Sequence, residues 1–127
     1  MELSLPVKAR YWRITNIHTA DGTFAISGFR IFGTAGGSLP PKATNVCATR
    51  DAADPCIVRL QWTASKTATG YNIRYGSAVN KLYHTYQVFD KNLLIIRNLN
   101  KDQHCYFTVD SFNENGIQEG TKIIFVK

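Results

Sequence analysis

Alternating side chains near the end of the chain constrain its fold more than any other feature. Leu99 is followed six residues later by a run in which every second side chain is apolar or small, except for a final Asn, and an Asn-Gly pair ends the run. The members of the run are Cys105, Phe107, Val109, Ser111 and Asn113, and the pair is Asn115-Gly116. Because successive side chains of a strand point to opposite faces, the spacing predicts one strand entering a corner and a second strand leaving it.

Further short strands precede this run at the spacing that a β-sandwich requires. We expect strands at residues 43–49, 57–63, 70–75, 83–88, 93–98, 104–113 and 122–126. No helical pattern of useful length occurs on either side of the Gly- and Pro-rich stretch at residues 33–42. The predicted fold class is therefore all-β.

The N-terminal part of the chain predicts an additional β-hairpin. Residues 8–17 alternate apolar with polar side chains, Asp21-Gly22 supplies a turn, and residues 23–32 form a returning strand. A single hairpin is marginally stable in water, so this one must pack on other structure. We expect a monomer in which it packs against the sandwich through aromatic residues, namely Trp12 with Phe29 or Phe32.

The composition is that of a globular protein. With 127 residues, 44% hydrophobic and 19% charged, the chain is long enough for one domain with its own core. The net charge of +6 raises nucleic acid as a partner, but Lys and Arg are spread singly, so we expect none. No apolar run has the length of a membrane span. No signal peptide is visible, so we expect the targeting information to lie upstream.

Side chains suited to catalysis or metal binding are not grouped. The acids fall mostly in predicted turns, Asp110 is expected on an exposed strand face, and we expect no catalytic residue. Of the three cysteines, Cys56 shares the inward parity of its strand and Cys47 does not, which disfavours a disulfide between them. We expect buried free thiols, Cys105 among them. The histidines show no ligand spacing with these cysteines, so neither a metal nor a cofactor is expected.

Several aromatic residues are expected on sheet faces. Pyranose rings stack on exposed aromatic rings, so a carbohydrate platform would need such side chains with polar groups nearby. Two interpretations stay open: the rings cover a sheet face or an interdomain contact, or they contact a polysaccharide. The candidates for carbohydrate contact are Tyr83, Tyr86, Phe89 and Tyr106, with Phe112 as a further ring.

Residues 43–127 resemble a fibronectin type III domain, an immunoglobulin-like sandwich of two antiparallel sheets. Trp62 and Tyr71 match the family's core tryptophan and its partner tyrosine, and the run after Leu99 matches its corner. The family usually has a tyrosine six residues after the leucine, whose hydroxyl ties the corner to the backbone. Here Cys105 takes that place and Tyr106 follows it, so we expect the bond to be lost unless a bulge restores it. The resemblance implies a core that contains Trp62, Tyr71, Leu99, Cys105, Phe107 and Val109.

The stretch ARYWRITNIHTADGTFAISGFRIFG, residues 9–33, resembles the closing strands of a galactose-binding-like domain of the discoidin or coagulation-factor C type. We therefore divide the chain into residues 1–36 from such a domain, a Gly/Pro linker at 37–42 and a fibronectin type III domain at 43–127. Gly36-Gly37 is interpreted as a flexible joint. The whole arrangement resembles the C-terminal region of bacterial glycoside hydrolases of xylosidase, arabinofuranosidase or xylanase type.

This resemblance implies a non-catalytic accessory role, in spacing, domain packing and weak polysaccharide contact, within a secreted enzyme of plant-polysaccharide metabolism such as xylan degradation. The partners would be the upstream catalytic and galactose-binding-like domains, and the location would be extracellular, periplasmic or at the bacterial cell surface. The alternative is a cell-surface protein-interaction or adhesion module that uses a basic face or an exposed strand edge. Neutral glycans should bind in the first case, and a protein with strong salt sensitivity in the second.

Overall fold

The computed structural model describes residues 7–9, 12–15, 22–23 and 36–127. The chain divides into two compact units, residues 1–31 and 32–127. The predicted hairpin falls mostly outside the described residues, and so does its expected contact with the sandwich through Phe29 or Phe32. In the described part of the first unit, Trp12 and Ile14 are exposed.

All the regular secondary structure among the described residues of the second unit is β-strand. The strands are β1 (Thr44–Arg50), β2 (Val58–Thr63), β3 (Gly70–Gly76), β4 (His84–Phe89), β5 (Leu93–Ile96), β6 (Cys105–Asn113), β7 (Gly116–Gln118) and β8 (Ile124–Val126). The first six begin within one residue of the predicted positions. The described part of the chain contains no helix that is long and apolar enough to cross a membrane.

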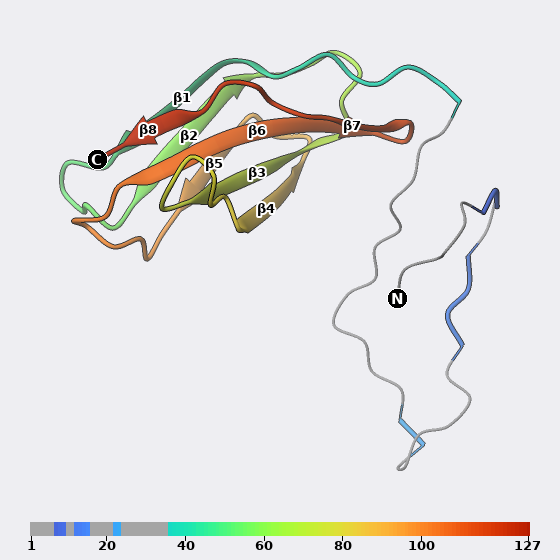
Figure 1. The fold of residues 1–127 in the computed structure, drawn as a ribbon, viewed down its shortest axis with the longest axis horizontal. Helices are drawn as coiled ribbons and strands as arrows, with labels where there is room; N and C mark the ends of the chain where they lie inside the picture. Colours follow the sequence, from blue (N-terminus) through green and yellow to red (C-terminus); the bar gives the residue numbers. More distant parts are fainter. Residues whose placement is uncertain (1–6, 10–11, 16–21, 24–35) are drawn as a thin grey trace. The chain divides into compact units, whose positions relative to one another are not determined.

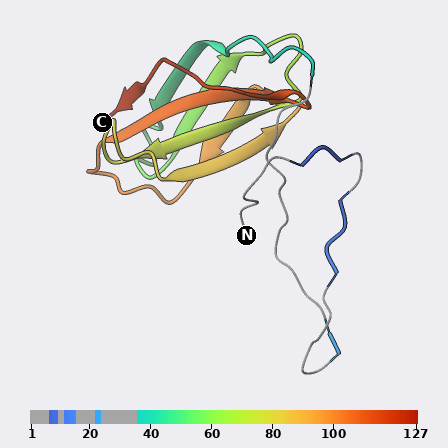
Figure 2. The same ribbon diagram turned by 45° about the vertical axis from the view of Figure 1, so that its right-hand side comes forward.

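The strands form two antiparallel sheets that face each other (Figure 1). The smaller sheet has the order β1-β2-β5, and the larger one has the order β4-β3-β6-β7, with β8 also paired to β6. Strand β6 is the centre of the larger sheet because it pairs with β3 along one side and with β7 and β8 along the other. Strand β4 pairs with β3 and lies at the edge of this sheet, which the rotated view of Figure 2 shows from another side. The predicted all-β sandwich is confirmed.

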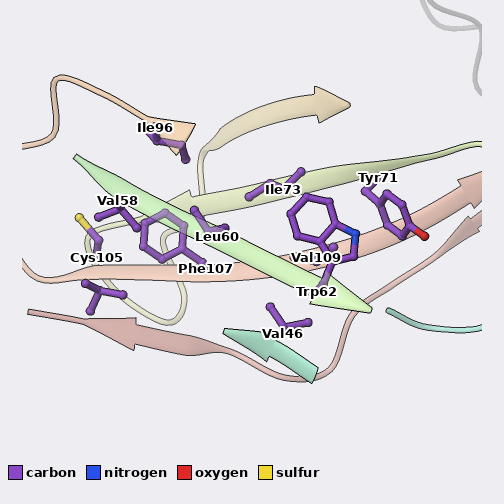
Figure 3. Packing of buried hydrophobic residues seen from close by; sticks show 11 residues of the cluster. Val46, Val58, Leu60, Trp62, Tyr71, Ile73, Ile96, Cys105, Phe107 and Val109 are labelled. Atoms are coloured by element: carbon purple, nitrogen blue, oxygen red, sulfur yellow. The ribbon is translucent and has the colours of Figure 1, made fainter. Parts of the chain in front are cut away.

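The core fills the space between the two sheets, as Figure 3 shows. On β2, Val58, Leu60 and Trp62 are buried, whereas the residues between them are exposed. Because the strand period is two, this alternation turns one complete face of β2 toward the opposite sheet. The core residues from the larger sheet are Tyr71, Ile73, Cys105, Phe107, Val109 and Val126, and Leu99 from the β5–β6 connection is partly buried against the core.

The rings of Trp62 and Tyr71 meet across the sandwich. Their centroids are 5.2 Å apart and their planes are inclined by 62°, an edge-on arrangement. Such aromatic pairs contribute about 0.5–1.5 kcal/mol beyond the burial of their surface. The Tyr71 hydroxyl also accepts a hydrogen bond from the Ser65 N–H over 2.7 Å, so the same side chain joins the core to the β2–β3 loop.

The corner between β5 and β6 has no tyrosine bond of the expected family type. Cys105 is buried in the core, and the neighbouring Tyr106 points the other way, where its ring lies 5.3 Å from that of Phe125. Arg50, at the end of β1, holds the corner instead. Its guanidinium donates hydrogen bonds to backbone carbonyl groups of Pro55, Asn100, Gln103 and Lys127. One side chain therefore joins the β1–β2 loop, the β5–β6 corner and the residue after β8.

The last predicted strand is confirmed in part, and a strand that was not predicted precedes it. We expected one strand at residues 122–126; β8 covers the end of this range, and β7 lies before it, separated from β8 by an irregular segment. Within this segment the Gly120 N–H donates a hydrogen bond to Asp110 Oδ1 over 2.8 Å. A carboxylate that accepts from the backbone competes with strand pairing, so the ladder between β6 and the following chain is interrupted at this point.

Asp110 is buried rather than exposed, which corrects the expectation from its strand position. It is 3% exposed, and it accepts hydrogen bonds from Arg74 Nε over 2.6 Å and from Arg74 Nη2 over 2.9 Å. The hydrogen bond with Asp110 raises the pKa of the Arg74 guanidinium above its ordinary value. Alternation placed Asp110 on the outer face, but its burial depends on which side chains and segments cover that face.

Replacing Arg50 by alanine should lower the free energy of unfolding by about 2–4 kcal/mol, because several carbonyl groups lose a charged donor at once. Urea denaturation followed by circular dichroism measures the change. Arg59→Ala, which removes an exposed arginine from the neighbouring strand, is the matched control and should change stability by less than about 0.5 kcal/mol. Equal losses for the two variants would contradict the role assigned to Arg50.

Candidate binding surface

The outer face of the larger sheet carries a row of apolar residues across four strands. The strand register pairs Phe89 of β4 with Gly70 of β3, Gly70 with Phe112 of β6, and Phe112 with Ile117 of β7. Phe89 is 56% exposed and Ile117 is 41% exposed. This row, called the Phe89 strip below, is an apolar surface that faces solvent.

Gly70 gives the Phe89 strip its shape. A Cβ atom at this position would lie 2.5 Å from Phe112 Cζ and 2.6 Å from the Val88 carbonyl oxygen, so only glycine fits. The Phe112 ring can therefore lie close to the bare backbone of β3, which it also shields from water. Phe89 completes the strip with its ring centroid 5.4 Å from that of Phe112 and the planes inclined by 83°.

The polar groups next to the Phe89 strip carry no net charge. In the next row of the sheet, Gln87 Nε2 donates a hydrogen bond to Asn72 Oδ1 over 3.2 Å. The same row continues into Asp110, the register partner of Asn72, and the ion pair of Asp110 with Arg74 balances the two charges. Neutral amides beside exposed rings are the groups that orient a neutral, hydroxyl-rich ligand.

Tyr86, one of the predicted carbohydrate contacts, lies elsewhere. Its register partner is the buried Ile73, so it belongs to the inward parity of β4 and not to the outer face. Its ring stacks on Tyr75 with centroids 5.9 Å apart, and Tyr75 in turn stacks on Phe107 at 5.7 Å. Tyr86 is thus the outermost ring of a stack that begins in the core.

The two remaining candidates are also separate from the Phe89 strip. Tyr83 is 79% exposed and lies immediately before β4. Tyr106 lies at the opposite end of β6 from Phe112, where Phe125 packs between the rings of Tyr106 and His104. The structure therefore does not bring the four predicted residues into one platform. Of the four, only Phe89 belongs to the strip, where its ring packs against that of Phe112.

Among the described residues, no three His, Cys, Asp or Glu side chains are grouped closely enough to hold a metal ion. Acids in the β1–β2 loop stabilise that loop: Asp51 Oδ1 accepts from the Ala53 and Asp54 N–H groups over 2.9 and 3.0 Å. These two bonds, that from Asp54 first, lower the pKa of Asp51.

The three cysteines are free thiols in the structure. Cys105 is buried and Cys56 is half-buried, whereas Cys47 is exposed. The expectation of buried thiols is therefore correct for Cys105 but not for Cys47, whose exposed position agrees with the outward parity expected from its strand. Cys47 lies on the outer face of the smaller sheet, in register with Gln61, whose carbonyl oxygen it approaches to 3.6 Å.

Sequence reasoning found Phe89 and Phe112 but missed Gly70 and Ile117. The available signal was the glycine that opens the GYNIRYG strand, because a glycine inside a strand often marks a place where another group lies close to the backbone. Which ring fills that place depends on the register of β3 against β6. Register between strands distant in sequence is set by packing and cannot be read from one strand alone.

Neither a protein-family model nor a curated protein sequence matches the chain. Similar solved structures include an Fn3-like protein from Clostridium thermocellum, with 16% identity, a TM-score of 0.63 and coverage of 71% of this chain and 94% of that one. The fn3 domain of human contactin 1 has 22% identity, a TM-score of 0.61 and coverage of 83% and 91%. The FN5 domain of Drosophila Lar has 19% identity, a TM-score of 0.56 and coverage of 69% and 95%.

These comparisons define the class of the sandwich. It has the fibronectin type III fold, in agreement with the strand order and the Trp62–Tyr71 pair described above. At such identities the likeness shows the fold alone, because one fold serves many functions.

The tyrosine stack predicts a loss of stability in alkali. Burial raises the pKa of the Tyr75 hydroxyl above its ordinary value of 10.0, with Tyr86 and Cys105 adding to the shift. The folded state therefore holds this proton more tightly than the unfolded state. The resulting contribution to stability is complete below pH 10.0 and is lost as the pH rises through the folded-state pKa.

Urea denaturation of the Tyr75→Phe variant between pH 8 and pH 11 tests this prediction, with roughly half-unit steps. The variant should show a smaller decline in the free energy of unfolding above pH 10.0 than the unchanged chain. Tyr83→Phe, which removes an exposed hydroxyl, is the control and should keep the full decline. An identical decline in all three proteins would contradict the assignment to Tyr75.

Proposed function

We propose that this chain is a non-catalytic accessory module from a secreted bacterial glycoside hydrolase that acts on plant polysaccharide of xylan or arabinan type. Residues 1–36 would be the last strands of a galactose-binding-like domain, 37–42 the connection, and 43–127 the fibronectin type III domain. The catalytic domain would lie upstream, and the module would work outside the cell. The fibronectin type III fold supports an accessory or interaction role.

The single observation that favours a carbohydrate partner is the Phe89 strip. It presents exposed aromatic surface beside uncharged amides on a chain whose net charge is +6. Pyranose rings have apolar faces that stack on aromatic rings and hydroxyl groups that bond to amides. Only two members of the strip, Phe89 and Ile117, are large exposed apolar residues, so we expect weak binding that matters mainly when the parent enzyme is already on its substrate.

A protein-interaction module is the second candidate function, and one observation favours it. β4 pairs on one side with β3, and among the described residues no strand pairs with its other side. It contains no Pro, Lys or β-bulge, the usual devices that protect an edge strand from pairing with another chain. The similar domains of contactin 1 and Lar fit this alternative as well as the bacterial one fits the first.

Affinity electrophoresis tests the proposal. The protein is cationic, so it should be run in acidic native gels that contain xylan, arabinan, arabinoxylan or galactan. Retardation by one polymer is expected, and Phe89→Ala should weaken it about tenfold in dissociation constant, the loss of one aromatic contact of about 1.4 kcal/mol.

The matched control is Phe125→Ala, since Phe125 is also a half-exposed phenylalanine on the larger sheet but lies by Tyr106. It should leave the retardation unchanged. Retardation that is lost in Phe125→Ala and kept in Phe89→Ala would move the contact to the Tyr106 end. Free migration in all four gels would contradict polysaccharide binding and leave the protein-interaction function, for which salt-sensitive binding is expected.

A further inference from the structure

The chain segment just before β1 is bonded to the turn between β6 and β7. The amide of Asn115 contacts two consecutive residues of this segment: its Oδ1 accepts from the Gly37 N–H over 3.1 Å, and its Nδ2 donates to the Ser38 carbonyl over 3.1 Å. A side-chain amide that bonds one N–H and one C=O of the backbone does what a neighbouring strand would do.

The turn itself is built to hold this amide in place. Asn113 Oδ1 accepts a hydrogen bond from the Asn115 N–H over 2.9 Å, and Asn113 Nδ2 donates a second bond to the Ser38 carbonyl over 3.1 Å. Ser111, on the inward parity of β6, donates to the Pro41 carbonyl over 2.7 Å. Between these points Pro40 is fully buried.

Only one of the two adjacent glycines packs against the Asn115 amide. A Cβ atom at Gly37 would lie 2.5 Å from Asn115 Oδ1 and 2.8 Å from its Cγ, whereas a Cβ atom at Gly36 would meet nothing within 4 Å. Gly37 thus lies directly against the Asn115 amide. A flexible joint, which the sequence suggested for this pair, would not need such a contact.

We propose that residues 37–41 are a strap that belongs to the folded domain and occupies the β6–β7 turn as its permanent ligand. The partner of this turn is the incoming segment of the same chain, recognised through its backbone by Asn113 and Asn115. The domain then acts as a stiff connector whose ordered structure starts at Gly37 rather than at Ala43. The turn is not available to an external partner. This inference does not rest on the proposed carbohydrate contact.

NMR relaxation of the uniformly labelled 127-residue chain tests the strap. Backbone order parameters at residues 37–41 should match those of the strands, about 0.85, where a flexible connection would give values below about 0.6. Hydrogen exchange of the Gly37 amide should be slowed at least about tenfold relative to an unstructured chain, since that N–H is bonded to Asn115.

Two single substitutions separate the strap from general stability. Gly37→Ala keeps every bonding group but displaces the Asn115 amide, so order parameters at residues 37–39 should fall below about 0.6 and the protection at residue 37 should be lost. Gly36→Ala is the matched control and should change neither quantity. Asn115→Ala should reproduce the effect of Gly37→Ala, and unchanged amide shifts in β2 and β3 will show that each variant is folded.

Low order parameters at residues 37–41 in the unchanged chain would overturn the proposal. It would also be overturned if these residues stay ordered in both Gly37→Ala and Asn115→Ala, because the contact with the turn would then not be what holds them. Neither outcome bears on retardation by polysaccharide, which depends on Phe89, so failure of the strap and failure of the proposed function are distinguishable.

Discussion

The burial of one face of β6 against β2 is the interaction on which the other features depend. Phe107 and Val109 on β6 and Leu60 and Trp62 on β2 all belong to one buried cluster between the sheets. Once that face is buried, the period of two places Asp110 and Phe112 on the opposite face. The ion pair, the Phe89 strip and the turn that holds the strap all follow from the position of this strand.

Charged side chains hold loops of the domain through hydrogen bonds that the apolar core cannot supply. Arg50 bonds the carbonyl groups of a corner where the usual tyrosine is missing, and Asp110 joins Arg74 to the Gly120 N–H. Both are buried or half-buried groups whose partners come from distant parts of the chain. Hydrogen bonds to charged groups are stronger than those between neutral groups, so a few side chains can fix several loops.

The strands were predictable because their signals are local. Alternation in β2, the Leu99-to-Cys105 spacing and the Asn115-Gly116 turn predict the elements and their order without knowledge of any contact. Strand β7 and the interruption after it were not predicted, because that interruption depends on the carboxylate of a residue about ten positions earlier in the chain. The prediction that Asp110 is exposed was wrong for a related reason. Parity tells which face of the sheet a residue is on, but not which other segments cover that face.

The sequence by itself determined the fold class, the order of the strands and most of the core, since hydrophobic period and turn residues are properties of neighbouring positions. Tertiary structure alone decided which aromatic rings meet. Phe89 reaches Phe112 across Gly70, and Tyr86 turns toward Tyr75, because the register between strands sets those pairs. It also decided that Gly37 packs on Asn115 while Gly36 does not. Such contacts join residues far apart in the chain, and no local pattern records them.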